Sequence, residues 1–254
     1  PGRFLELHFI PLQPIIVMMT KSFIQISDSH IDDNKFVMGV DSQANLSTIV
    51  STISKHYYDA LLISGDLAHN GTLESYQKLR KILNPIEAKI YVLPGNHDDL
   101  SNLSQIFNQS SLCNFIIGCW EVITIDSVQV DKVSGRLNDE QLNSLSQQIS
   151  SSSAKYIALC LHHPPVSMQS DWDDGMSLEN PEDLFAVIDQ FDNIKAIMWG
   201  HAHQCSESNR NGVKLFSCPS TAVQFDEQPG SGYNHYTLND NGEIYCKTQW
   251  LEYF

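Results

Sequence analysis

The first half of the chain alternates between short apolar runs and longer amphipathic stretches. The apolar runs have the length of β-strands and cover residues 22–27, 59–64 and 89–93. Between them, residues 45–58 and 72–83 place apolar side chains three or four positions apart, which is the spacing of one helical face. Strands that alternate with helices in this way predict βαβ units and parallel strands.

The second half repeats this alternation and then changes. Its alternating part comprises strands and helices at residues 120–126, 139–149 (with Asn138 as N-cap), 155–161, 181–191 and 194–199. Strands without intervening helices follow, at residues 214–218, 233–238 and 243–251. We therefore predict an α/β fold with two mixed β-sheets packed face to face and helices on the outside, a four-layer α/β/β/α sandwich.

The 254 residues suffice for one large α/β domain, which we place at residues 19–254. Residues 1–18 are predicted to be a leader that is not native or lies outside the core, with Met18 or Met19 as the natural start. The apolar run at residues 9–19 contains two prolines and is too short to span a bilayer, so no membrane partner is expected.

The charge of the chain limits the class of partner that it can bind, and its cysteine content indicates the cellular compartment. The 15 Lys and Arg against 30 Asp and Glu give a formal net charge of -15, which repels polyanions. We therefore expect a small-molecule substrate and no nucleic acid. The six cysteines form no CxxC pair and are expected to be reduced thiols, which predicts a cytoplasmic protein. The sequence leaves the oligomeric state open, a homodimer included.

Polar side chains follow five of the predicted parallel strands. They are Asp28, His30, Asp66, Asn96, His162, His201 and His203. Because parallel strands joined by crossovers end at one edge of a sheet, we expect these clusters to meet. A single such residue is ordinary turn or capping chemistry. Together, oxygen and imidazole donors without cysteine match what borderline divalent metals accept, and their number suits two ions.

The five clusters also form a pattern that resembles a known family. In order they read D-x-H, G-D, G-N-H-D, H and G-H-x-H, as in the calcineurin-like metallophosphoesterases. The resemblance covers residues 22–225. Weaker likenesses, such as Gly65-Asp66-Leu67 and the run at residues 218–221, point to the bacterial class III cyclic nucleotide phosphodiesterases within it.

The resemblance implies a role for each ligand. Asp28, His30 and His203 would hold one metal, Asn96, His162 and His201 the other, and Asp66 would bridge them. The two divalent or trivalent ions would be Mn, Fe, Zn or Co. A hydroxide between them would attack the phosphorus of a 3',5'-cyclic nucleotide, with cyclic AMP as the expected substrate and the nucleoside 5'-monophosphate as the product.

Two residues beside Asn96 are assigned to catalysis. His97 would neutralise phosphoryl charge or protonate the leaving 3'-oxygen. Asp98 would orient the imidazole of His97, or else cap the following helix. Asn96, His97 and His69 are the expected contacts of the substrate phosphate, although a turn role is the stronger interpretation of His69.

Several alternatives remain open at this point. The same chemistry would suit a glycerophosphodiester or a 2',3'-cyclic nucleotide, and a non-catalytic scaffold on this fold is the alternative from another class. His163 competes with His162 as a ligand, and the resemblance favours His162. The loop around Trp172 either covers a nucleobase or shields the core. His56 and His235 are expected to have no role at the site.

Overall fold

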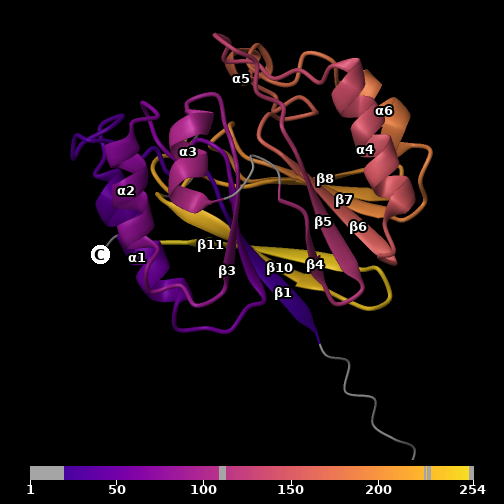
Figure 1. The fold of residues 1–254 in the computed structure, drawn as a ribbon, viewed down its shortest axis with the longest axis horizontal. Helices are drawn as coiled ribbons and strands as arrows, with labels where there is room; N and C mark the ends of the chain where they lie inside the picture. Colours follow the sequence, from indigo (N-terminus) through magenta and orange to yellow (C-terminus); the bar gives the residue numbers. More distant parts are fainter. Residues whose placement is uncertain (1–19, 109–112, 226, 228–229, 252–254) are drawn as a thin grey trace, which may run out of the picture.

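The computed structural model describes residues 20–108, 113–225, 227 and 230–251, so the predicted leader, residues 1–18, lies outside the described residues. Two β-sheets face each other, and helices lie on their outer sides (Figure 1). This is the four-layer α/β/β/α arrangement predicted from the sequence, and the prediction is confirmed.

The first sheet has five strands in the order β11-β10-β1-β2-β3. Their bounds are Lys21–Ile26 (β1), Ala60–Ser64 (β2), Lys89–Leu93 (β3), Gly232–Leu238 (β10) and Ile244–Trp250 (β11). β1, β2 and β3 run parallel, and β10 and β11 extend the sheet in the antiparallel sense. Every residue of β2 is buried, because both faces of this central strand are covered.

The second sheet has six strands in the order β4-β5-β6-β7-β9-β8. Their bounds are Phe115–Ile117 (β4), Trp120–Ile125 (β5), Tyr156–Leu161 (β6), Ile194–Trp199 (β7), Ser206–Arg210 (β8) and Val213–Ser217 (β9). β5, β6, β7 and β9 are parallel, and β4 and β8 form antiparallel edges.

Helices cover the outer face of each sheet. The helices are α1 (Ser42–Ile53), α2 (Leu73–Ile82) and α3 (Leu100–Phe107) on the first sheet, and α4 (Asp139–Ser151) and α6 (Pro181–Ile188) on the second, with α5 (Asp171–Asp174) as a single turn at the top of Figure 1. A third apolar cluster lies between the sheets and includes Phe23 and Leu62 from one sheet and Trp120 and Met198 from the other. Burial of this shared layer joins the two sheets.

Some elements differ from the prediction for local reasons. α1 begins at Ser42 because the side chain of Asp41 accepts a hydrogen bond from the backbone N–H of Ala44, and it ends at Ile53 rather than at residue 58. Strand β8 was not predicted, since its sequence SESNR has no apolar residue. It forms because Asn211 and Gly212, with φ of 54° and 88°, turn the chain back onto β9.

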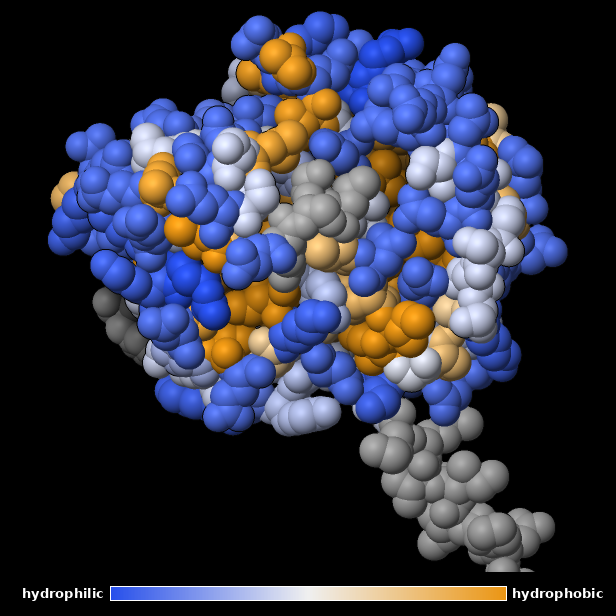
Figure 2. Space-filling model, in the orientation of Figure 1, coloured by the Kyte–Doolittle hydropathy of each residue, from blue (hydrophilic) through white to orange (hydrophobic). Residues whose placement is uncertain are grey.

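The surface is polar over most of the face in Figure 2, where hydrophobic residues gather in separate patches. Exposed apolar side chains include Val130 and Tyr57, which are 88% and 84% exposed. Among the described helices, none combines the length and the apolar character needed to cross a bilayer.

Candidate metal and active site

The seven predicted ligands lie in the loops that follow β1, β2, β3, β6 and β7. Because these strands end on the same side of two facing sheets, their loops meet. Backbone hydrogen bonds join them: the N–H of Asp28 donates to the carbonyl of Gly65 (3.0 Å), and the N–H of Gly200 donates to the carbonyl of His162 (3.1 Å). The prediction that these loops share one edge of the fold is confirmed.

The backbone at this edge is strained. Five of the seven predicted ligands adopt the left-handed conformation that L-residues avoid: Asp28 (φ 52°), His30 (42°), Asp66 (50°), His201 (65°) and His203 (47°). Such residues persist where the surrounding structure imposes the conformation, and they concentrate at functional sites. The strain therefore marks these loop residues as a built site.

Glycines permit the close approach of the loops. A Cβ added at Gly95 would lie 2.2 Å from Asp66 Oδ1 and 2.7 Å from His162 Nε2. One added at Gly200 would lie 1.9 Å from Ser27 Oγ and 2.7 Å from Asp28 Oδ2. The glycines of the G-N-H-D and G-H-x-H motifs are thus required because neighbouring side chains, predicted ligands among them, occupy the space that a Cβ would take.

The first ligand cluster contains Asp28, His30 and His203, whose donor atoms lie within 4.8 Å of one another. His30 Nε2 is 3.1 Å from His203 Nε2, and His203 Nε2 is 3.5 Å from Asp28 Oδ1. All three side chains are buried, at 0–2% exposure. The backbone N–H of His201 donates to Asp28 Oδ2 (2.9 Å) and fixes that carboxylate.

The second cluster centres on His162 Nε2. This atom is 3.2 Å from Asn96 Oδ1, 3.3 Å from His201 Nδ1 and 3.4 Å from Asp66 Oδ1. The Nε2 of His201 is buried without a hydrogen-bond partner among the described residues. The imidazole of His201 therefore presents Nδ1, and not Nε2, to the shared centre.

Asp66 lies between the two clusters. Its Oδ2 is 3.6 Å from His30 Nε2, and its Oδ1 is 3.4 Å from His162 Nε2. The backbone N–H of His97 donates to Oδ1 (2.9 Å) and holds the carboxylate in this orientation. The position agrees with the bridging role expected for Asp66.

The electrostatics of the buried group favour positive charge. Burial would raise the pKa of Asp66, but His162 and His30 outweigh it and hold that pKa well below its usual value. Burial lowers the pKa of His162, but Asp66 and Asp28 outweigh it and raise that pKa to about 9. Burial lowers the pKa of His30 to about 3. The buried carboxylates therefore remain negative and attract positive charge to this group.

The hydrogen bonds of two rings test whether metal ions fit. His162 Nδ1–H donates to the carbonyl of Ser64 (2.9 Å), and His203 Nδ1–H donates to the carbonyl of Val223 (2.6 Å), because a carbonyl oxygen can only accept. In the neutral rings, each Nε2 then points a lone pair at other acceptor atoms. Buried acceptors that converge without a donor are the ligand set of a cation. The residues fit two metal ions, one on each side of Asp66.

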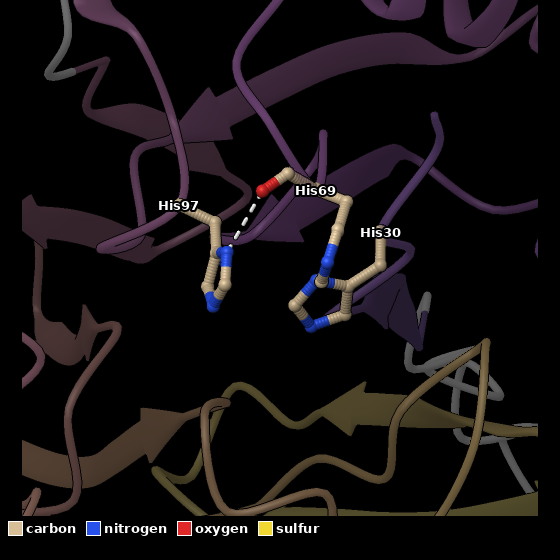
Figure 3. A group of neighbouring side chains, drawn as sticks. All are labelled: His30, His69 and His97. Carbon is tan, nitrogen blue, oxygen red and sulfur yellow. Dashed lines mark hydrogen bonds between the residues drawn. The ribbon is translucent and has the colours of Figure 1, made fainter. Parts of the chain in front are cut away.

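His97 and His69 lie beside His30 (Figure 3). His97 Nδ1–H donates to the backbone carbonyl of His69 (2.8 Å), and the rings of His97 and His69 stack with centroids 5.0 Å apart. His69 Nδ1 is 3.3 Å from His30 Nδ1. The structure thus brings His97 and His69, two of the three predicted substrate contacts, together, and both line one cavity with Asn96.

Asp98 does not occupy its predicted position. Its carboxylate accepts hydrogen bonds from the backbone N–H groups of Leu67, Ala68 and Gly95 and from the hydroxyl of Tyr76, and none from the imidazole of His97. The predicted role as the direct orienter of His97 is therefore wrong, and the carbonyl of His69 has that position. The alternative as helix N-cap is wrong by one residue, since Asp99 caps α3. Burial, together with the negative charge of Asp66, raises the pKa of Asp98 to about 6.

His163 and Trp172, the remaining candidates, occupy different environments near the site. His163 is buried, with Nδ1 2.8 Å from Ser127 Oγ and Nε2 3.1 Å from the carbonyl of Val133. Both ring nitrogens therefore have hydrogen-bond partners, although one of them lies within 4.8 Å of ligand atoms of His162 and His201. Trp172 lines the cavity above the ligands together with Phe225, a neighbour that the sequence did not indicate because 53 positions separate them.

Comparison with solved structures first defines the fold class. The structure superimposes on a dimetal phosphatase from Danio rerio with a TM-score of 0.72, over 90% of this chain and 95% of the other, at 12% identity. At that identity the likeness concerns the fold alone. The two facing sheets are therefore arranged as in that dimetal phosphatase.

Sequence comparison then defines the family. The profile of the calcineurin-like phosphoesterases matches residues 21–205, and the chain belongs to this family. It is 51% identical over 233 residues, 92% of this chain and 100% of the relative, to a probable cyclic nucleotide phosphodiesterase of Vesicomyosocius okutanii. It is 32% identical over 237 residues, 87% of this chain and 86% of the relative, to the 3',5'-cyclic adenosine monophosphate phosphodiesterase CpdA of Pseudomonas aeruginosa. Members of the family bind two divalent metals, which agrees with the two ligand clusters.

Proposed function

We propose that the protein is a metal-dependent phosphodiesterase that hydrolyses a 3',5'-cyclic nucleotide, cyclic AMP first among them, to the nucleoside 5'-monophosphate. The observation that carries the proposal is the convergence of buried acceptor atoms on both sides of Asp66, beneath His97. The substrate class is supported by the relatives, which are named cyclic nucleotide and cyclic AMP phosphodiesterases. The formal charge of -15 disfavours nucleic acid as a substrate.

The chain's own residues divide the work between two metal positions. Asp28, His30 and His203 would hold one ion, Asn96, His162 and His201 the other, and Asp66 would touch both. Mn, Fe, Zn and Co are the ions that this donor set accepts. When bound, two such ions lower the pKa of a water molecule and neutralise charge on the phosphoryl group.

His97 and Asn96 would bind the substrate, and His97 would protonate it. Because His97 Nδ1–H is donated to the carbonyl of His69, Nε2 is the ring nitrogen left for a phosphoryl oxygen or for the leaving 3'-oxygen, to which it would deliver a proton. The Oδ1 of Asn96 faces His162, so its NH₂ group is left to donate to the phosphate. His69 would line the phosphate pocket through its ring stacked on His97.

A side-by-side assay tests the proposal. Purified protein with added manganese is offered cyclic AMP, cyclic GMP, a 2',3'-cyclic nucleotide, glycerophosphocholine and a chromogenic monoester. We expect the highest kcat/KM for a 3',5'-cyclic nucleotide, with phosphate remaining on the 5'-oxygen of the product. Turnover confined to the monoester would refute the proposal, and a preference for glycerophosphocholine would move the function to another small diester.

The variant Asp66→Ala serves as the inactive reference, because loss of the shared carboxylate should remove metal and activity together. Its matched control is Asp59→Ala, which removes a carboxylate at the opposite end of β2. Full activity of Asp66→Ala would contradict the two-metal assignment. Retained metal without activity would limit Asp66 to catalysis.

We also propose that the protein is a cytoplasmic enzyme with a small-molecule substrate. Its six cysteines are all free thiols, which fits a reducing compartment. Fractionation of cells that express the native gene would test this, and recovery in the periplasmic or membrane fraction would contradict it. Sedimentation of the purified protein would determine whether it is a homodimer.

A further inference from the structure

The cavity above the ligand clusters has two chemically different sides. It measures about 290 Å³. Its floor is polar and consists of ligand side chains with His97 and His69. Its other side is apolar, and we call it the aromatic wall: Met38, Val133, Trp172, Met176 and Phe225. A substrate that fills the cavity must therefore place a charged group on the floor and an uncharged group against this wall.

Trp172 and Phe225 are the two aromatic residues of the aromatic wall. Their side chains remain 58% and 46% exposed. The ring of Phe225 stacks on the imidazole of His203 with a centroid distance of 4.1 Å and an interplanar angle of 6°. The indole of Trp172 stands at 88° to Phe225, with centroids 5.1 Å apart. The wall thus begins directly at a predicted metal ligand and extends outward through two perpendicular rings.

The indole is held in place by its own short element. Trp172 lies in α5, and the carboxylate of Asp174 accepts hydrogen bonds from the hydroxyl of Ser167 (2.6 Å) and from the backbone N–H of Met168 (2.7 Å). The hydroxyl of Ser177 donates to the carbonyl of Asp173 (3.0 Å). These bonds tie α5 to the chain on both sides, so Trp172 is presented at the cavity rather than folded into the core.

The charge around Trp172 excludes a phosphate contact. Asp171, Asp173 and Asp174 surround it in sequence, and α5 contains no Lys or Arg. Carboxylates repel a phosphoryl group, so the phosphate belongs on the floor with His97. A flat, uncharged, π-bonded group remains as the part of the substrate that suits the wall, and a nucleobase is that part of a cyclic nucleotide.

We propose that the aromatic wall is the nucleobase platform of the cavity and that Trp172 is its specificity-determining residue. This inference rests on the proposed cyclic nucleotide phosphodiesterase activity, which it deepens. Trp172 stacks on the base and contributes to substrate binding. It makes a diester with a base a better substrate than the same diester without one.

Two substrates and three variants test the inference. The substrates are cyclic AMP and 1-deoxyribose 3',5'-cyclic phosphate, which carries the same cyclic diester without a base. Trp172→Ala should lower kcat/KM for cyclic AMP by about 5- to 150-fold, mainly through KM, because base stacking on an aromatic ring contributes that much. The base-free substrate should be hydrolysed as by the wild type. Trp172→Phe should recover most of the loss. Tyr57 is an exposed aromatic residue that does not line this cavity, so Tyr57→Ala should leave kcat/KM unchanged for both substrates.

Other outcomes of the same experiment would contradict the inference. An equal loss on both substrates, or no loss on either, would overturn the platform. A change in sedimenting mass for Trp172→Ala, with unchanged base preference, would show that the wall is instead an interface between copies of the chain.

Calorimetry separates this inference from the proposed function. Manganese-loaded wild type should bind 5'-AMP more tightly than ribose 5-phosphate, and Trp172→Ala should reduce that difference. Wild type that binds in this way but does not hydrolyse cyclic AMP would refute the proposed function alone. Equal binding of 5'-AMP and ribose 5-phosphate would refute the platform.

Discussion

Asp98 is expected to hold two ligand-bearing loops together, and Asp98→Asn tests this role. Its Oδ2 accepts from the backbone N–H of Leu67 (3.1 Å) and of Gly95 (2.9 Å). Its Oδ1 accepts from the N–H of Ala68 (3.0 Å) and from the hydroxyl of Tyr76 (2.8 Å). One carboxylate therefore joins the loop after β2 to the loop after β3.

The cost of the substitution follows from the count of donors. Asn keeps one acceptor oxygen and replaces the other by an NH₂ donor. With NH₂ in place of Oδ1, the N–H of Ala68 stays unpaired and the hydroxyl of Tyr76 loses its acceptor. The opposite orientation leaves the N–H groups of Leu67 and Gly95 unpaired. Since one unpaired buried donor costs about 1–3 kcal/mol, the better orientation loses at least that amount. This is a large share of a typical unfolding free energy of about 5–15 kcal/mol.

The assay monitors urea unfolding by circular dichroism in the presence of a metal chelator. Metal content is measured separately after dialysis against manganese. The matched control is Asp99→Asn, the same chemical change one residue later, where Asn caps a helix as well as Asp does. We expect a lower midpoint and less bound metal for Asp98→Asn alone. Equal midpoints of the two variants would refute the structural role. A lower kcat with unchanged stability and metal content would indicate instead that Asp98 acts on His97.

Three further perturbations have defined outcomes. His97→Ala should keep both metals and lose about 10²–10⁴-fold in kcat, the usual contribution of a proton-transfer residue; metal analysis beside kinetics checks this, and full activity would remove His97 from the mechanism. Gly95→Ala should abolish metal binding, because its Cβ would lie 2.2 Å from Asp66 Oδ1, whereas Gly175→Ala, whose Cβ meets nothing closer than 3.4 Å, should keep it. Chelation should lower the thermal midpoint reversibly, since ions at 100 times their Kd stabilise the fold by about 2.7 kcal/mol per site; an unchanged midpoint in calorimetry would contradict a structural contribution of the metals.

The sequence predicts that the polar clusters meet at one edge of the fold, because each cluster follows the end of a strand. The lengths of the βαβ units, 38 positions from Asp28 to Asp66 and 30 from Asp66 to Asn96, place the polar clusters at one edge before any contact is known. The periodicity that identifies the strands depends on burial, and the strands are buried. Strand ends and their loops are therefore readable from the chain alone.

The contacts between loops are not readable in this way. The partners of Asp98 are three backbone N–H groups and Tyr76, which a sequence motif does not encode because any residue supplies a backbone N–H. The hydrophobic pattern did not predict strand β8, because a strand at the edge of a sheet does not need an apolar face. The aromatic wall likewise depends on the tertiary approach of Trp172 to Phe225, which periodicity does not predict.

Five predicted ligands have a left-handed backbone conformation, which either the fold or the bound metal could impose. Substitutions of His201 can distinguish these two causes. A non-glycine residue in this conformation (φ 65°) costs about 1–2 kcal/mol, whereas glycine adopts it freely but loses about 0.5–1 kcal/mol more in backbone entropy. If the fold imposes the conformation, His201→Gly in chelator should be about 0.5–1 kcal/mol more stable than His201→Ala.

The same pair of substitutions at Ser47, an exposed position within α1, should give the opposite order, because alanine is favoured over glycine in a helix by about 1 kcal/mol. Urea unfolding measures both pairs. Alanine favoured at both positions would mean that the loop leaves the left-handed conformation without metal. The predicted reversal would mean instead that hydrogen bonds such as the one from the His201 N–H to Asp28 preorganise the ligands, so that metal binding does not have to supply the energy of the strained backbone.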